Sequence, residues 1–191
     1  MAIAWGLLCP LAIAASMLRD FFPPGMFFQI HRAVNSLVVG LTLIAFSLAL
    51  RATNIENLDH FADEPHRKLG LVIFIFAFVQ ALNGALRPHA TEPGEEKKTV
   101  RLGWEIGHRA FGLLTLILSW VNCNTGLERY FLKFDSGSDD EDKLRVIFWI
   151  FAAGISGIAF VTFVATKSMG GGEEPAPPKD AEAQTPNEVE T

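Results

Sequence analysis

Charged residues are scarce in five long stretches of this 191-residue chain. Half of all residues are hydrophobic, the mean hydropathy is +0.27, and a single Tyr accompanies 16 Phe. A bilayer-crossing helix needs about 20 mostly apolar residues, whereas the strands of a membrane barrel alternate in polarity and are about half as long. We therefore predict an all-α integral membrane bundle of about five transmembrane helices, with no room for a second folded domain. The expected spans are roughly residues 2–18, 27–50, 69–86, 102–124 and 146–166.

Cysteine is also rare, and Cys9 and Cys123 are the only two. Both lie in apolar stretches, so we expect small packing residues rather than a disulfide framework. No basic residue precedes the first apolar stretch, which argues against a cleaved signal peptide and for a first span. No pair of broken helices is evident, which disfavours a small-solute carrier. No nucleic-acid partner is expected, and the lipid bilayer is the expected surroundings.

The chain divides into a membrane domain over residues 1–167 and a tail over residues 168–191. After Met169 come three glycines and then mostly Pro, Glu and Ala. This composition buries too little apolar surface to fold, so we expect a disordered acidic tail. Basic residues are slightly more numerous on the side of the membrane where the first span ends. This bias favours a cytoplasmic location for that side and for the tail.

Three of the apolar stretches are opened by a His-Arg dipeptide, with His31, His66 and His108 as the histidines. An imidazole is costly inside a membrane and needs a partner. Because successive spans alternate in direction, His31 and His108 lie near one face of the bilayer and His66 near the other. Two imidazoles that face each other fill both axial positions of a haem iron, so one-electron transfer is the expected chemistry. The alternative is that each histidine is an ordinary interfacial residue.

Arginines follow these histidines and have two interpretations. In the first interpretation, Arg32 and Arg109 form charge-assisted hydrogen bonds with haem propionates. In the second, they anchor the helices at the membrane interface by snorkelling. The sequence favours neither interpretation over the other.

Several short motifs follow one another in a characteristic order and spacing. They are Ala4-Trp5-Gly6 with Pro10, Phe27-Phe28-x-x-His31, His66-x-x-Leu69-Gly70, Gln80 with Arg87-Pro88, and Trp104-x-x-x-His108-x-x-x-Gly112 followed by Asn122 and Gly126. In these residues the chain resembles the cytochrome b561 family, in particular the membrane core that follows a DOMON domain in ferric-chelate-reductase-like proteins. The resemblance covers roughly residues 1–167.

The resemblance implies a helical bundle with two b haems, one near each face, held by histidines of alternate helices. It implies that His31 and His108 hold the haem nearer the cytoplasm and that His66 is half of a second site. It also implies electron transfer from cytoplasmic ascorbate to monodehydroascorbate or ferric iron on the opposite side, which would make the chain a transmembrane reductase. A homodimer is compatible with it.

The loop before the fourth expected span carries basic residues that fit this function. By the resemblance, Lys97, Lys98 and Arg101 are candidates for attracting an anionic electron donor. A positive-inside loop explains the same residues equally well.

The chain also departs from the family pattern. In the family, a His-Gly pair stands shortly before the Trp-Gly element, and here that position would fall before Met1, which leaves His66 without its expected partner. We expect that the sequence is a truncated product of a longer gene. The alternative is a binding or assembly subunit that holds a single haem and does not complete the path across the membrane. Smaller departures are Ala12, Asn35 and Glu105, where Gly, Gln and Asn are usual.

Overall fold

The computed structural model describes residues 1–56, 65–88, 99–134 and 140–169. These residues form helices and connections, with no strand among them. Lys97, Lys98 and almost all of the expected tail lie outside the described residues. The helices are η1 (Ala4–Leu8), α1 (Cys9–Met17), η2 (Arg19–Phe21), α2 (Met26–Ile55), α3 (Pro65–Ala85), α4 (Thr99–Phe134) and α5 (Asp140–Met169).

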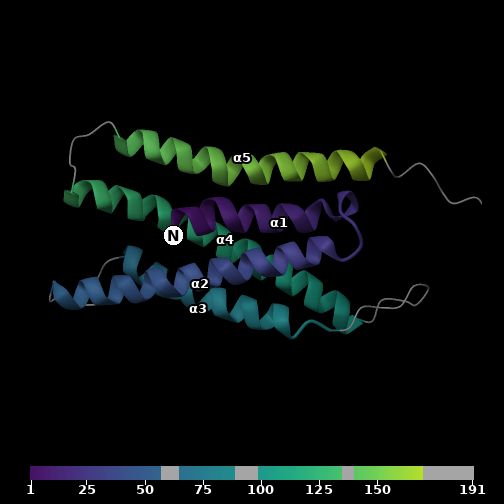
Figure 1. The fold of residues 1–191 in the computed structure, drawn as a ribbon, viewed down its shortest axis with the longest axis horizontal. Helices are drawn as coiled ribbons and strands as arrows, with labels where there is room; N and C mark the ends of the chain where they lie inside the picture. Colours follow the sequence, from purple (N-terminus) through teal and green to yellow (C-terminus); the bar gives the residue numbers. More distant parts are fainter. Residues whose placement is uncertain (57–64, 89–98, 135–139, 170–191) are drawn as a thin grey trace, which may run out of the picture.

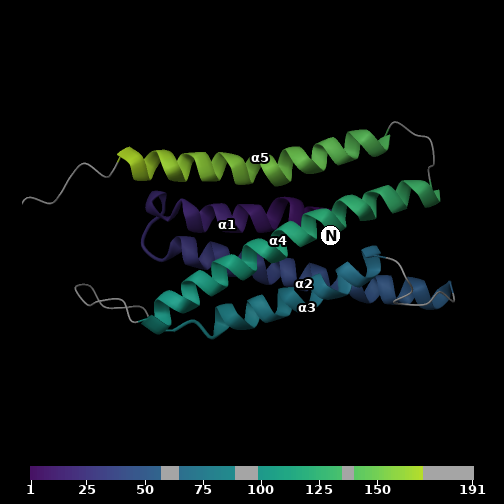
Figure 2. The same ribbon diagram turned by 180° about the vertical axis from the view of Figure 1, so that it is seen from behind.

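Four of these helices, α2 to α5, are long and apolar enough to cross a membrane. Each contains or closely matches one of the four later spans expected from the sequence, so the helical membrane bundle is confirmed. Successive helices run in opposite directions and lie side by side (Figure 1). Seen from behind, α4 crosses the bundle obliquely, from α3 at its own beginning toward α5 at its end (Figure 2).

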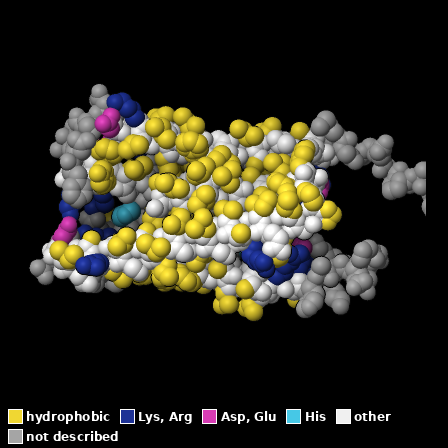
Figure 3. Space-filling model, viewed as in Figure 1, with side chains coloured by type: hydrophobic (Ala, Val, Ile, Leu, Met, Phe, Trp, Pro, Cys, Tyr) yellow, Lys and Arg dark blue, Asp and Glu magenta, His cyan; other side chains and the backbone are white. Residues whose placement is uncertain are grey.

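The bundle has two ends that matter for the site. The His31 end is where α2 and α4 begin and α3 terminates, and the His66 end is where α3 begins and α4 terminates. Large apolar side chains remain exposed along the flanks of α2 to α5, and Figure 3 shows them as a broad apolar belt between the two ends. Such a belt is what a bilayer-embedded protein presents to lipid.

The first expected span is helical but shorter than the others. It begins as a π-helix of five residues, η1, and continues as α1 with nine. Pro10 explains the local geometry, because proline has no N–H to donate to a preceding carbonyl. The N–H of Cys9 donates to the carbonyl of Ala4, as the wider π turn requires. In the next π-type hydrogen bond, the N–H of Pro10 would donate to the carbonyl of Trp5. Proline has no N–H, so the Trp5 carbonyl receives no hydrogen bond from it.

A side chain of α4 supplies the missing donor. The indole Nε1 of Trp120 donates to the carbonyl of Trp5 at 2.9 Å. The Trp5 indole in turn donates to the hydroxyl of Thr42 on α2 at 3.2 Å. Trp5 is 4% exposed and belongs to the buried core together with Cys9, Val38, Ile73 and Leu116. These contacts fix the short first helix between α2, α4 and α5. Both cysteines are free, as expected.

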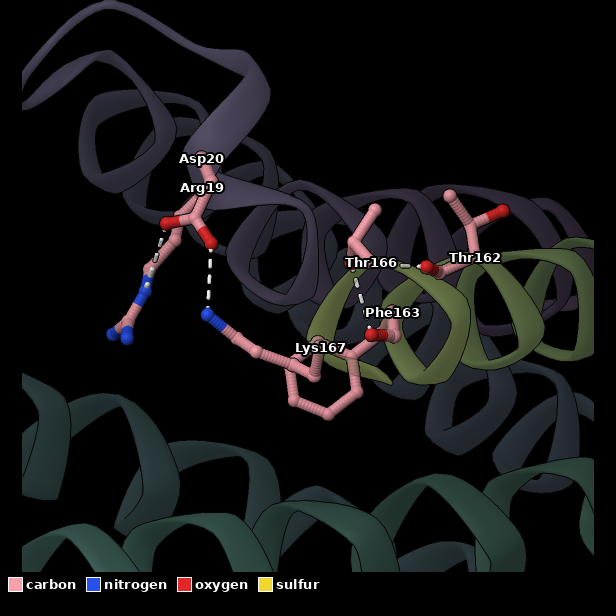
Figure 4. A network of polar contacts seen from close by, with 6 residues as sticks. All are labelled: Arg19, Asp20, Thr162, Phe163, Thr166 and Lys167. Carbon is pink, nitrogen blue, oxygen red and sulfur yellow. Dashed lines mark hydrogen bonds and ion pairs between the residues drawn. The ribbon is translucent and has the colours of Figure 1, made fainter. Parts of the chain in front are cut away.

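The short helix η2 after α1 is tied to the end of α5 by an ion pair. The Nζ atom of Lys167 lies 2.9 Å from Oδ2 of Asp20. On the other side of the same carboxylate, Nε of Arg19 lies 3.6 Å from Oδ1 (Figure 4). Asp20 thus joins two segments that are distant in the sequence at the His31 end of the bundle.

We expect this contact to make a small, pH-dependent contribution to stability. The hydrogen bond and charge of Lys167 hold the pKa of the Asp20 carboxyl below its ordinary value of about 3.8. A carboxyl whose pKa is lowered in the folded state stabilises the protein above its ordinary pKa, and this contribution is lost as the pH falls through the folded value. Asp20→Asn should therefore lower the melting temperature slightly at pH 6 and by less near pH 2.5, as followed by circular dichroism in detergent. Equal effects at both pH values would contradict this.

Candidate functional site

Two of the three expected histidines come together at the His31 end. His31 lies near the beginning of α2 and His108 lies in α4. Their ring centres are 6.4 Å apart, with an angle of 64° between the ring planes. Two imidazoles bound to opposite sides of one metal ion, each with a metal–nitrogen distance of about 2 Å, place their ring centres about 6 Å apart. The spacing therefore fits a metal ion shared by both rings.

A hydrogen bond from the His31 ring to a backbone carbonyl leaves the other ring nitrogen suited to bind a metal. Nδ1 of His31 lies 2.9 Å from the carbonyl oxygen of Ala12, which only accepts hydrogen bonds, so Nδ1 carries the proton. In the neutral ring Nε2 is then unprotonated and has a lone pair for a metal. A backbone carbonyl that orients a ligating imidazole in this way is a common partner of metal-bound histidine. Asn35 supports the same turn by donating from Nδ2 to the carbonyl of His31 at 2.9 Å.

The ring of His108 is packed on one face and has an unpaired nitrogen. The indole of Trp104 stacks on it at 4.9 Å between ring centres and 13° between planes. Gln80 of α3 donates to the backbone carbonyl of His108 at 2.8 Å. Among the described residues, Nδ1 of His108, Oε1 of Gln80 and Oδ1 of Asn122 are buried without a hydrogen-bond partner. Buried polar atoms are normally satisfied, so the unpaired atoms of His108 and Gln80 suit a site that receives a further group.

The two arginines expected beside these histidines lie at the surface. The side chain of Arg109 is 74% exposed, with Nη2 4.0 Å from Oε2 of Glu105. Arg32 is exposed and donates from Nη2 to Oε1 of Gln29 at 2.8 Å. Interfacial anchoring and contact with a propionate are both compatible with these positions.

Sequence reasoning missed a third arginine here and treated it only as the end of a span. The guanidinium carbon of Arg87 lies 4.7 Å from the ring centre of Phe28, and that of Arg32 lies 5.8 Å from the same centre. Two guanidinium groups therefore lie near the Phe28 ring at the beginning of α2. The Phe27-Phe28 pair and the Arg87-Pro88 pair were visible in the sequence, but nothing in it indicated that they meet.

The expected donor-docking residue Arg101 is buried, at 8% exposure. It donates from Nε to Oε1 of Glu105 at 2.9 Å and from Nη1 to the carbonyl of Pro88. Its guanidinium carbon also lies 5.2 Å from the ring centre of Trp104. This cation is engaged inside the protein, so its position does not favour docking of a soluble anion.

The third histidine, His66, lies at the opposite end of the bundle. Nδ1 of His66 is 3.2 Å from the hydroxyl of Thr125, which itself donates to the carbonyl of Asn122 at 3.1 Å. The hydroxyl therefore accepts from His66, which carries its proton on Nδ1. A Cβ at Gly126 would stand 2.8 Å from Cε1 of His66, so only glycine allows this close approach.

His66 lines a hollow whose other lining residues include several Lys and Arg side chains. The hollow has a volume of about 430 Å³, and Figure 3 shows a histidine with Lys and Arg side chains in a depression at this end. Lys133 there pairs with Glu56 at 2.6 Å. The residues that line the hollow are His66, Arg67, Gly126, Arg129, Tyr130, Leu132 and Lys133.

The structure does not bring His66 to the histidine pair. Gly84, near the end of α3, faces His108, whose Cε1 would lie 3.6 Å from a Cβ added there. His66 stands at the beginning of the same helix, about 27 Å away at the α-helical rise. Within the described parts of the chain, no three His, Cys, Asp or Glu side chains gather as a metal cage.

These features define a multi-pass helical membrane protein with a histidine pair suited to an axially ligated metal centre. The sequence pattern described as eukaryotic cytochrome b561 matches residues 25–133, which include all three histidines. The chain belongs to this family, as the motifs predicted. The family binds b-type haem and is one of transmembrane, haem-based electron transfer.

Three relatives from Arabidopsis thaliana are similar to this chain. A cytochrome b561 domain-containing protein is 31% identical over 132 residues, which are 66% of this chain and 47% of the relative. A cytochrome b561 and DOMON domain-containing protein is 28% identical over 75% of this chain and 32% of the relative. A cytochrome b561, DM13 and DOMON domain-containing protein is 26% identical over 79% and 16%. The chain thus spans less than half the length of each relative. No solved structure matches it.

Proposed function

We propose that this chain holds a b haem between His31 and His108 and carries single electrons across the bilayer. The observation that supports this most strongly is the 6.4 Å separation of the two rings. The bond from His31 to the carbonyl of Ala12 adds to it, because it leaves Nε2 unprotonated before any metal binds. A bound haem would supply one-electron redox chemistry.

The residues of the chain then have separate tasks. His31 and His108 would hold the haem iron between them, and a haem held by two imidazoles would supply one-electron transfer. Trp104 and the Gln80 bond hold His108 in position. Arg32 and Arg109 are the proposed propionate partners, with interfacial anchoring as the alternative.

The electron donor in this proposal is ascorbate at the His31 end, which we take to be cytoplasmic together with the tail. Ascorbate gives up one electron and one proton and becomes monodehydroascorbate. An anionic donor suits a face that carries Arg32, Arg87 and Arg109. Lys97 and Lys98 remain proposed docking residues, whereas the buried position of Arg101 argues for another role.

The electron acceptor in this proposal is monodehydroascorbate or a ferric chelate at the His66 end. Each takes up one electron, and monodehydroascorbate also takes up one proton from the solvent on that side to become ascorbate, so electrons balance one for one. The hollow beside His66 supports this, because Arg67, Arg129 and Lys133 line it and suit an anionic acceptor. His66 would be half of a second haem site whose other ligand does not come from His31 or His108.

A single-haem binding or assembly subunit is the second candidate function. It is favoured by the position of the described histidines, which form one pair at one end and leave His66 at the other. A chain of this kind would bind haem but would not complete a path across the membrane.

A vesicle assay separates the two functions. Phosphatidylcholine vesicles that contain the haem-loaded chain are filled with ascorbate, ferric citrate is added outside, and ferrous iron is followed by a chromogenic chelator. We expect iron reduction at least about tenfold faster than with His108→Ala or protein-free vesicles. Haem-loaded wild-type protein that is no faster than these controls would contradict transmembrane transfer and favour the single-haem subunit.

A further inference from the structure

Beside the histidine pair, three side chains of α4 form a stack that ends at His108. The guanidinium of Arg101 lies over the ring of Trp104, at 5.2 Å from its centre. The Trp104 ring also stacks on the imidazole of His108, nearly parallel to it at 4.9 Å between ring centres. Trp104 is also fixed by a 3.0 Å hydrogen bond from Nε1 to the carbonyl of Asn83 on α3.

The cation in this stack is buried and has one acidic partner close by. The side chains of Arg101 and Glu105 are 10% and 16% exposed, and Nε of Arg101 lies 2.9 Å from Oε1 of Glu105. Burying a charge is expensive unless it is paired and hydrogen-bonded. The contacts to Glu105 and to the carbonyl of Pro88 meet that requirement and set the direction of the guanidinium.

The charges of the pair also act on Arg87. Burial and the charge of Arg101 lower the pKa of Arg87, and Glu105 acts in the opposite direction. The carboxylate therefore offsets positive charge at this end of the bundle. Glu105 can act on the site in two ways. Its ion pair with Arg101 fixes the guanidinium that lies over Trp104, and Trp104 stacks on His108. Its own negative charge also stands one helical turn before His108.

We infer that the Arg101–Glu105 ion pair positions His108 and compensates charge beside it, so that it sets the redox potential of the site. Arg101 holds Trp104 against the imidazole of His108. Glu105 compensates the positive charge of Arg101 near the haem iron. The inference rests on the proposed function, since it takes His31 and His108 as the haem ligands. Both residues of the pair are positioning residues and make no contact with a reacting atom.

The sign of each effect follows from electrostatics. An uncompensated positive charge near a redox centre favours the reduced form, and an uncompensated negative charge favours the oxidised form. Glu105→Gln keeps an acceptor for Arg101 but removes the negative charge. Arg101→Gln removes the positive charge and leaves the carboxylate. Removing both restores the original net charge, although it loses the cation over Trp104.

Redox titrations of the haem-loaded full chain in detergent test this, with haem per chain recorded for every variant. We expect Glu105→Gln to raise the equilibrium constant for reduction about three- to tenfold, where tenfold corresponds to about 59 mV for one electron. Arg101→Gln should lower it by a similar factor. The double variant should return to within about twofold of wild type.

Opposite shifts that cancel distinguish a charge effect from simple disruption, which would move both single variants in the same direction. Glu141→Gln is the matched control, because Glu141 pairs with Arg145 at the same spacing on α5, at the other end of the bundle. It should leave the constant unchanged. A Glu105→Gln shift below about 1.5-fold or toward the oxidised form overturns the inference, whether or not Arg101→Gln folds.

Haem content separates this inference from the proposed function. Wild-type protein that takes up no haem, or that keeps it after His108→Ala, overturns both. Haem that depends on His108 but titrates identically in wild type and Glu105→Gln overturns only the role of the ion pair.

Discussion

His108→Ala should remove the haem at the His31 end almost completely, with a loss of at least about 100-fold in affinity. Loss of an outer hydrogen-bond partner alone typically costs 10- to 100-fold in metal affinity, and here an axial ligand itself is removed. The ring of His108 is held 6.4 Å from that of His31 by contacts to α3 and Trp104. Alanine provides no substitute donor. Haem per chain, determined by pyridine haemochrome after purification, measures the effect.

His31→Ala and His66→Ala are the matched comparisons. His31→Ala should cause the same loss, because each ring supplies one axial position of the same iron. His66→Ala should leave this haem in place, since His66 stands at the other end of α3 and contacts Thr125 and Gly126 instead. Full retention of haem in His31→Ala, or its loss from this site in His66→Ala, would assign the ligands differently.

Gly6→Ala should destabilise the bundle by about 1–3 kcal/mol through overpacking. A Cβ at Gly6 would stand 2.6 Å from Cε2 of Phe148 on α5. The ring of Phe148 is only 6% exposed, so it has little space in which to move. The change acts where the short first helix meets α5. Thermal unfolding of the full chain in detergent, followed by circular dichroism, measures the loss.

Gly154→Ala is the control for this substitution. Gly154 also lies within a helix, but a Cβ there would meet nothing within 4 Å. Alanine in an open helical position is expected to stabilise the helix by about 0.5–1 kcal/mol. Similar stability changes in the two variants would show that the contact with Phe148 does not limit the packing.

The membrane architecture was predictable from the sequence because bilayer thickness imposes a length on apolar helices. The same rule placed His31 and His108 together, since alternating spans bring the beginnings of α2 and α4 to one end. The length rule did not predict how short the first helix is, nor its π turn. That turn depends on the missing N–H of Pro10 and on a donor from Trp120, which is distant in the sequence.

The finer features of the site depend on groups that carry little sequence signal. The acceptor for His31 is the backbone carbonyl of Ala12, which any residue type would supply. Arg101 was interpreted as a candidate for attracting an anionic donor or as part of a positive-inside loop, yet it is buried. The four-residue spacing to Glu105 on one helix was the available signal, because acidic and basic side chains at that spacing pair with each other.

The central claim is that His31 and His108 together occupy both axial positions of one haem iron. A dithionite-reduced minus oxidised spectrum of the purified full chain, repeated under carbon monoxide, tests it most directly. We predict at least one low-spin b haem per chain and no spectral change with carbon monoxide, because no coordination position is open. A chain without haem, or a haem that binds carbon monoxide, would contradict the claim.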